Sequence, residues 1–155
     1  MSEHSFELFA DYHQFYLQDE KVDGNLSDSW TPEATERLLA IAPGTIGVGT
    51  VRNMDVPVQI KVLTEAPDLD LDAWDHVVEC GIDVPTGKIV VAGCTDYFPD
   101  AARIIVPVGH YRARVLYSGL DAISEDGLDG KDRYHVVLWP ADGDDVTVLK
   151  FRRAG

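Results

Sequence analysis

The chain has 155 residues and a mass of 17.1 kDa, with 27 acidic and 13 basic side chains and a formal net charge of −14. This length fits one domain, so we expect residues 1–155 to form a single domain. The charge argues against nucleic acid as a direct ligand, because phosphates would be repelled, whereas a basic protein would be attracted. The alternative is that the acidic surface only keeps the protein soluble.

The N-terminal region predicts no targeting segment. It has no basic stretch followed by an apolar core, and no apolar run in the chain reaches the ~18 residues of a membrane span. We therefore expect a cytoplasmic protein with no membrane partner.

Residues 6–17, FELFADYHQFYL, are rich in aromatics and predict one long strand or two strands joined at a bulge. Residues 19–29 are polar and predict a loop.

Residues 32–42 predict the one convincing helix. Thr31 offers a capping hydroxyl, Pro32 takes the first helical position, and Glu33 places an acid in the first turn. Apolar residues at 34, 38, 39 and 41 supply a stripe, and the Pro-Gly pair at 43–44 predicts the end of the helix.

The remainder of the chain is strand-like. Turn residues separate eight segments, at 45–52, 56–63, 75–83, 89–93, 103–106, 110–118, 133–139 and 146–151. No helices stand between them, as parallel strands would need. The fold class that this predicts is mainly β: a two-sheet antiparallel β-sandwich, like a jelly roll, with one short helix. In HYRARVLYS, Arg112 and Arg114 share the predicted outer face, with acids expected across the strand.

The two cysteines, Cys80 and Cys94, lack the CxxC spacing of a zinc ribbon. They flank a predicted hairpin turn at residues 85–88. We expect two buried thiols, which could face each other across that turn.

The stretch at residues 68–79, DLDLDAWDHVVE, has acids at the first, third, fifth and twelfth places of a calcium loop. The sixth place, which needs glycine, is Ala73, and strands flank the window where the motif requires helices. We therefore expect no calcium site. Instead, the acids form a displayed negative edge, and residues 119–132 add a flexible, solvated acidic loop. The candidate contacts with a basic partner are Asp68, Asp70, Asp72, Glu125, Asp126 and Asp129.

No catalytic motif is recognisable. The five histidines form neither HxH nor HExxH, and the chain lacks GxSxG and the glycine-rich phosphate loops. We expect no enzyme activity, no metal and no cofactor. An alternative function is binding of a small molecule or carbohydrate by an aromatic platform built from Trp30, Trp74, Trp139 and the aromatics of YHQFY, although aromatics at strand spacing are more often core residues.

Several segments resemble the competence protein J family in order and spacing: DYHQFY at 11–16, SWTPEA at 29–34, GTI at 44–46, VRN at 51–53 and the P-x-G-x-Y turn at 107–111. The motif residues are Tyr12, His13, Gln14, Phe15, Trp30, Pro107, Gly109 and Tyr111. That family is described as an inhibitor of the DNA-entry nuclease of naturally competent bacteria. The resemblance implies a non-catalytic protein whose partner is a basic nuclease, which it inhibits by occupying the groove for DNA.

Overall fold

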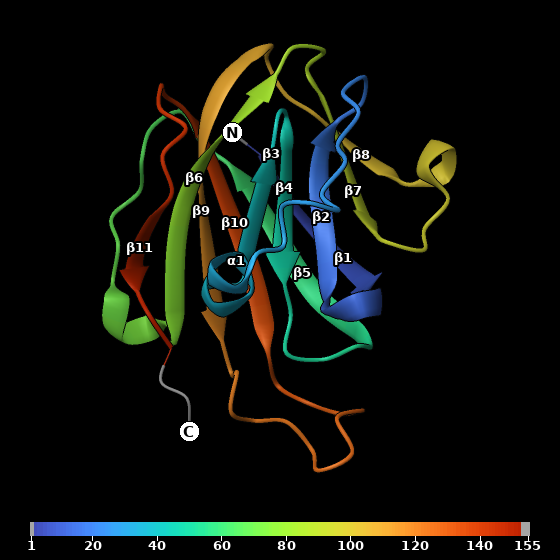
Figure 1. The fold of residues 1–155 in the computed structure, drawn as a ribbon. Coiled ribbons are helices and arrows are strands. Elements are labelled where there is room, and N and C mark those ends of the chain that lie inside the picture. The colour runs from blue at the N-terminus through green and yellow to red at the C-terminus, as the bar shows by residue number, and fades with distance from the viewer. Residues whose placement is uncertain (1, 153–155) are drawn as a thin grey trace.

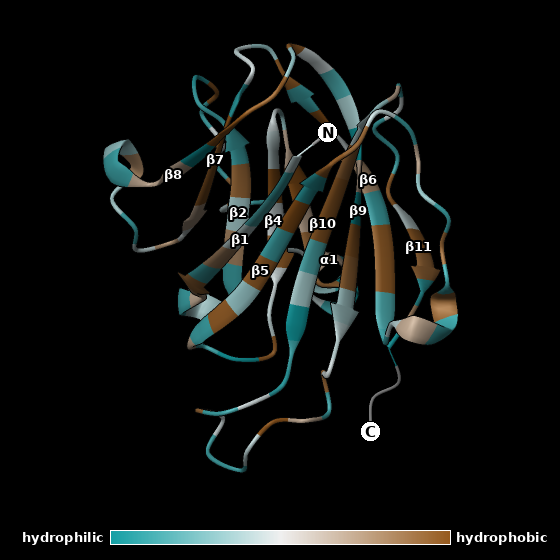
Figure 2. Ribbon diagram, turned by 180° about the vertical axis from the view of Figure 1, so that it is seen from behind, coloured by the Kyte–Doolittle hydropathy of each residue, from teal (hydrophilic) through white to brown (hydrophobic). Residues whose placement is uncertain are grey.

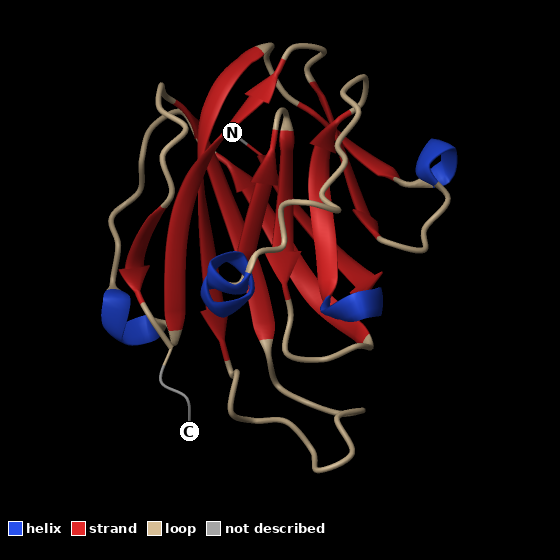
Figure 3. Ribbon diagram, viewed as in Figure 1, coloured by secondary structure: helices blue, strands red, loops and turns tan. Residues whose placement is uncertain are grey.

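Two β-sheets packed face to face make up the fold in a computed structural model that describes residues 2–152 (Figure 1). The six-stranded sheet contains, in spatial order, β1 (Ser2–Phe9), β5 (Asp55–Val62), β10 (Arg133–Pro140), β9 (Gly109–Ser118), β6 (His76–Val84) and β11 (Thr147–Lys150). The five-stranded sheet contains β3 (Leu39–Ala42), β4 (Thr45–Gly49), β2 (Gln14–Asp19), β7 (Lys88–Gly93) and β8 (Ala102–Ile105). The predicted mainly β sandwich is confirmed, as Figure 3 shows at a glance.

One strand pair departs from the wholly antiparallel arrangement. β5 and β10 run parallel, with Val58 opposite Tyr134 and Val62 opposite Leu138. Parallel neighbours need a long crossover, and the chain between these two strands supplies it by passing through both sheets. The sheets are therefore antiparallel, as predicted, except at this pair, and the jelly-roll likeness stays a prediction.

The segment predicted as one strand, or as two joined at a bulge, changes sheets in its middle. β1 belongs to the six-stranded sheet and β2 to the five-stranded sheet, with the 3-10 turn η1 (Asp11–His13) between them. Leu8 therefore faces the core from one sheet and Phe15 from the other. This change of sheet is why the apolar residues of the segment follow no single alternation.

The predicted helix at residues 32–42 is half as long as expected. Helix α1 (Pro32–Arg37) begins as predicted, with the Thr31 hydroxyl accepting a hydrogen bond from the amide of Ala34. It ends at Leu38, which adopts a left-handed conformation with φ of 60°. The following residues form β3, and the Pro-Gly pair makes the turn from β3 to β4. The residues of the predicted apolar stripe belong to two elements. Ala34 lies in α1, whereas Leu39 and Ile41 lie in β3. The described helices have at most six residues, and none is long and apolar enough to span a membrane.

The core lies between the sheets and is built by alternation along each strand. Val78, Cys80 and Ile82 of β6 face it, together with Tyr111 and Val115 of β9. Figure 2 shows the resulting alternation of hydrophobic and hydrophilic bands along β5, β10 and β6. On the outer face of the six-stranded sheet, the two arginines of β9 both contact Glu79 of β6, as expected from their pattern.

The turn between the two cysteines is no hairpin. Residues 85–87 connect β6 in one sheet to β7 in the other, so Cys80 and Cys94 do not face each other across a strand pair. Cys80 is fully buried, and burial raises the pKa of its thiol to about 12. Cys94 follows β7 and is exposed, so the prediction of two buried thiols is wrong for Cys94.

Candidate protein-interaction site

The turn between β1 and β2 holds two consecutive residues in the left-handed region of backbone space. Tyr12 has φ of 59° and His13 has φ of 57°. For residues with a Cβ this conformation costs on the order of 1–2 kcal/mol each. The amide of His13 donates to the carbonyl of Ala10 at 3.1 Å, and the His13 carbonyl accepts from the amide of Thr50 at 2.8 Å. These bonds hold the strained turn in place while the Tyr12 side chain stays 71% exposed.

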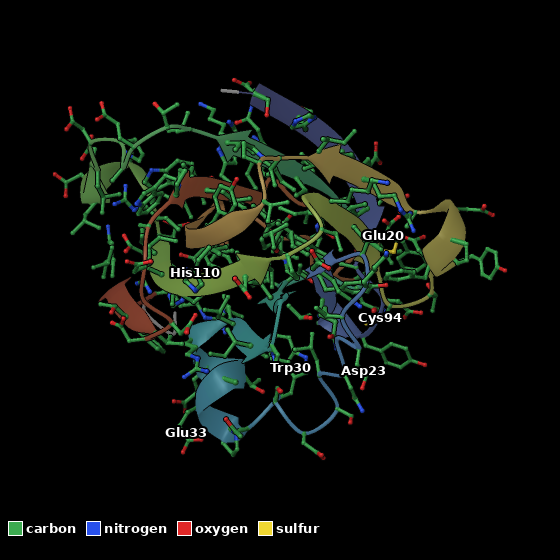
Figure 4. The ribbon with its side chains drawn as sticks, turned by 90° about the horizontal axis from the view of Figure 1, so that it is seen from above. Glu20, Asp23, Trp30, Glu33, Cys94 and His110 are labelled. Atoms are coloured by element: carbon green, nitrogen blue, oxygen red, sulfur yellow. The ribbon has the colours of Figure 1, made fainter. Side chains whose placement is uncertain are left out.

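Beside this turn, Trp30 packs on the outer face of the five-stranded sheet. Its indole Nε1 donates to the side-chain oxygen of Gln14 at 2.9 Å. The sheet has room for the indole because β4 carries glycine there. A Cβ at Gly47 would come within 3.0 Å of the Trp30 ring and 2.8 Å of Leu26. Figure 4 shows Trp30 outside the sheet, between α1 and the segment that carries Asp23.

Two grooves flank Trp30. The larger, with a volume of about 580 Å³, is lined by Tyr12, His13, Gln14, Thr35, Leu38 and Arg152 among others. The smaller, of about 310 Å³, is lined by Gln14, Tyr16 and Cys94 together with the loop at residues 24–27. Four of the eight motif residues thus come together on one surface. They are Tyr12, His13, Gln14 and Trp30.

The other four motif residues are structural. Phe15 is fully buried and meets the ring of Tyr134 edge-on, with 6.0 Å between centroids. Tyr111 is also buried, and its hydroxyl donates to the carbonyl of Pro107, four residues earlier. Gly109 lies in the same turn with φ of 157°. The P-x-G-x-Y motif therefore shapes the entry into β9, with Tyr111 buried and Pro107 exposed.

The acidic loop at residues 119–132 has internal structure. It turns back on itself through a bridge between Ile123 and Gly130. Within the turn, Asp126 accepts from the Ser124 hydroxyl at 2.6 Å and from the Leu128 amide at 3.0 Å, and these bonds lower the pKa of its carboxyl. Glu125 and Asp129 are exposed, as is Asp126. The loop therefore displays its carboxylates from a defined turn.

A buried ion pair anchors the base of this loop. Arg52 Nε lies 2.7 Å from Asp132 Oδ1, and the two side chains are 8% and 0% exposed. Arg52 also donates to the Leu128 carbonyl at 3.1 Å, and the Tyr134 hydroxyl donates to the second oxygen of Asp132 at 2.6 Å. Burial, above all, raises the pKa of the Tyr134 hydroxyl, which keeps it protonated as a donor. The spacing of residues 52 and 132 in the sequence did not indicate this pair. The one sequence signal for an ion pair was the single arginine in the VRN segment.

These parts meet at one end of the sandwich, which we call the acidic end: residues 10–13, 50–55, 70–75 and 119–132. Here β1, β4 and β9 end, and β2, β5, β6 and β10 begin (Figure 1). The side-chain oxygen of Asn53 accepts from the amide of His13 at 3.4 Å, and Asp75 accepts from the amide of Leu120 at 3.1 Å. The strained turn, the anchored loop and the start of β6 are therefore neighbours.

The stretch resembling a calcium loop contributes to this end through its middle. Asp70 caps the 3-10 turn η2 (Leu71–Ala73) by accepting from the amide of Asp72 at 3.0 Å. Glu79, the twelfth place, lies within β6 and accepts from Arg114 Nε at 2.8 Å. Asp68, Asp70 and Asp72 are exposed, as a displayed edge requires. Within residues 2–152, no group of three His, Cys, Asp or Glu side chains is arranged to hold a metal ion.

Two histidines have both ring nitrogens engaged. Buried His76 lies 2.7 Å from the Arg37 carbonyl through Nε2 and accepts the Arg152 amide at Nδ1. Burial lowers its pKa, and the charge of Arg152 adds to that effect. His110 lies 2.7 Å from the Ala141 carbonyl and 2.6 Å from Asp144, two acceptors that raise its pKa.

The three tryptophans do not share a platform. Trp74 and Trp139 lie with the apolar cluster on the outer face of the six-stranded sheet, whereas Trp30 lies on the other sheet. Trp74 meets the ring of His135 edge-on, and the Arg114 guanidinium lies over Trp139. The tryptophans of the predicted platform are therefore divided between the two sheets.

Comparisons with known proteins show similarity at the level of the fold. No protein-family model matches the sequence, and no curated protein matches it. Among solved structures, ComJ from Bacillus subtilis, inhibitor of the DNA-degrading activity of NucA, aligns with a TM-score of 0.67 and 18% identity over 91% of this chain and 96% of ComJ. The protein of crocagin biosynthetic gene J aligns with a TM-score of 0.62 and 20% identity, over 92% and 100% of the two chains. This chain therefore has the fold of ComJ.

Proposed function

We propose that this protein is a non-catalytic inhibitor of a nuclease. The observation that carries the proposal is the likeness to ComJ over nearly the whole of both chains. A net charge of −14 supports it, since a DNA-binding nuclease has a positive groove that attracts a negatively charged surface.

The surface that would enter the groove is the acidic end. Its exposed carboxylates resemble the phosphates of DNA in charge, and those of the loop at 119–132 project from an anchored turn. Exposed Tyr12 lies at the same end and supplies an aromatic anchor, the residue type that dominates the free energy of many interfaces. Fixed carboxylates cost less entropy on binding than mobile ones, because they are ordered beforehand. Asp68, on the approach to this end, would extend the contact along one side.

The proposal is tested by DNA cleavage in the presence of the purified protein. The probe is a DNA-degrading nuclease from the organism that encodes this chain, mixed with plasmid DNA at about 20 mM and about 300 mM NaCl. We expect stoichiometric inhibition at low salt that weakens at high salt, because exposed charges are screened. Undiminished cleavage at low salt, with the protein in excess, would contradict the proposal.

A second candidate function is binding of a carbohydrate or small molecule in the grooves beside Trp30. The observation that favours it is the pair of grooves of about 580 and 310 Å³, lined by Trp30 with Tyr12 or Tyr16. Stacking of a sugar on aromatic faces depends little on salt. A glycan array probed with the native protein and with Trp30→Ala distinguishes the two functions: binding that is lost in the variant and unchanged by salt supports this candidate.

A further inference from the structure

A groove opens at the end of the sandwich opposite the acidic end, where β6 ends and β9 begins. It has a volume of about 630 Å³ and lies between the edge of β6 and the turn from β3 to β4. Ile41, Gly44 and Ile82 give it apolar walls, and Asp83, His110 and Asp144 give it polar ones. Figure 4 views this end from above, with His110 on the six-stranded sheet.

The edge of β6 is open along this groove. β11 pairs only with the first half of β6, where Val148 lies opposite Val78 and Thr147 lies opposite Glu79. Beyond Glu79, the only neighbouring strand of β6 within residues 2–152 is β9. An unpaired strand edge exposes backbone donors and acceptors that can take up another strand.

The segment that would otherwise continue β11 is drawn away from this edge. Arg112 Nη1 donates to the carbonyls of Gly143 and Asp145 at 3.1 and 2.9 Å, and His110 Nε2 lies 2.6 Å from the Asp144 carboxylate. The segment can lie against the outer face because Gly81 has no side chain; a Cβ there would meet the Gly143 carbonyl. These contacts hold residues 143–145 away from the line of β11. The turn from β3 to β4 approaches the far end of the same edge, where a Cβ at Gly44 would lie 3.3 Å from the Asp83 carbonyl.

A second set of backbone groups faces the groove from β3. The carbonyl of Leu38 accepts from the Gly49 amide, so it points toward β4, whereas the carbonyl of Leu39 accepts from the Arg37 side chain on the opposite edge. Because backbone groups alternate along an antiparallel strand, those of Ile41 also point away from β4. Ile41 lines the groove. Both walls therefore offer strand edges.

The charge of the groove selects the occupant. Asp83 is exposed, and the Asp144 side chain is 82% exposed although one of its oxygens lies 2.6 Å from His110. Among residues 2–152, no Lys or Arg lines the groove. A second copy of this chain would bring like carboxylates together at the same edge, which is unfavourable. An extended segment carrying Lys or Arg matches both the strand edge and the charge.

We propose that this groove binds an extended, basic segment of a protein partner, which adds as a strand along β6 at residues 80–84. Its backbone pairs with β6, and alternate side chains point toward Asp83 and Asp144 and toward the apolar wall. This surface is separate from the acidic end, so the protein is able to hold one partner at each end.

The test uses synthetic peptides as probes of the edge. An alternating Lys-Val decapeptide is titrated into the isotope-labelled protein and followed by amide NMR. We expect shifts concentrated at residues 41–44 and 80–85. A Lys-Pro decapeptide keeps the charge but lacks half of the backbone donors, and a Glu-Val decapeptide reverses the charge; neither should bind at this edge.

Variants separate this edge from general attraction to an acidic protein. Asp83→Asn should weaken the Lys-Val peptide about threefold, the effect of one partly screened charge pair, while Asp100→Asn at another exposed site should leave its affinity unchanged. Shifts that spread over the acidic end instead, or equal binding of the Lys-Pro peptide, would overturn the proposal. So would a dimer detected by light scattering whose interface maps to residues 80–84, because the occupant would then be a second copy.

Discussion

His76 is held as a neutral imidazole by its neighbours. One ring nitrogen has a carbonyl partner that requires a donor, and the other accepts the amide of Arg152. Protonation would place two hydrogens on the ring and break the second bond within a buried site. His110 faces two acceptors, Ala141 and Asp144, so its protonated form is the favoured one. The two histidines therefore respond to pH in opposite directions.

The first prediction concerns stability in acid. The folded state lowers the pKa of His76 from its usual 6.5, so it binds fewer protons than the unfolded chain. The contribution of His76 to stability is present above pH 6.5 and is lost as the pH falls below that value. In His76→Gln, the free energy of unfolding should depend less on pH between about 5 and 7 than in the native protein. Urea unfolding at several pH values measures it.

The matched variant for that experiment is His110→Gln. The folded state raises the pKa of His110, so its contribution is present below 6.5 and is lost as the pH rises through the raised value. Removing it should make the loss of stability in acid steeper. The explanation fails if both variants change the pH dependence in the same direction.

The second prediction concerns the strain at Tyr12. Asn tolerates the left-handed conformation better than other residues with a side chain, so Tyr12→Asn should stabilise the fold by about 0.5–1 kcal/mol relative to Tyr12→Gln. Both variants lose the aromatic ring, and both should inhibit the nuclease less than the native protein does. Tyr97→Gln, which removes a tyrosine that is 70% exposed elsewhere, should inhibit normally. Urea unfolding measures the stability of the variants, and DNA cleavage measures their inhibition. If Tyr12→Asn is no more stable than Tyr12→Gln, the backbone at residue 12 is not strained.

At the scale of elements, alternation and turn residues predicted the eight segments after residue 44, since each strand has one face in the core. The second half of the helix predicted at 32–42 and the link within the segment 6–17 differ from the prediction. A local pattern does not show where the chain leaves one sheet for the other, so Leu39 and Ile41 fitted a helical stripe although they lie in β3. The exposed acids of the acidic end were predictable from the acid-rich stretches at 68–72 and 119–132. The ion pair of Arg52 and Asp132 depends on contacts 80 residues apart and was not.

The third prediction concerns that ion pair as the anchor of the acidic loop. Asp132→Asn leaves the buried Arg52 without its countercharge and should cost about 3–5 kcal/mol of stability, measured by urea unfolding. Asp129→Asn on the same loop should change stability by less than about 0.5 kcal/mol. The double variant Arg52→Met with Asp132→Leu should recover part of the loss, because two apolar side chains need no countercharge. A small effect of Asp132→Asn alone would show that the loop is not anchored there.

At the scale of the whole molecule, negative charge alone does not specify an interface. Acids occur at both ends of the sandwich, and a general field speeds association with any basic protein, by about 10–10³. What distinguishes the acidic end is that its carboxylates lie beside Tyr12 on elements tied together by the Arg52 network. The groove at the opposite end offers strand edges in place of an ordered array of carboxylates. The two proposed kinds of recognition are thus separated by the length of the sheets.

The last prediction compares two sets of three neutralising substitutions. One set, Asp121→Asn, Glu125→Gln and Asp129→Asn, lies on the acidic loop and leaves Asp126, which shapes the turn, in place. The other, Asp23→Asn, Asp100→Asn and Asp142→Asn, is also exposed but lies away from the acidic end. Both sets reduce the net charge equally, so an effect of total charge would be the same for both. We expect the first set to weaken nuclease inhibition at least about tenfold, and the second to slow association only slightly. Equal losses in stopped-flow binding and in DNA cleavage would mean that the whole field, and not the acidic end, makes the contact.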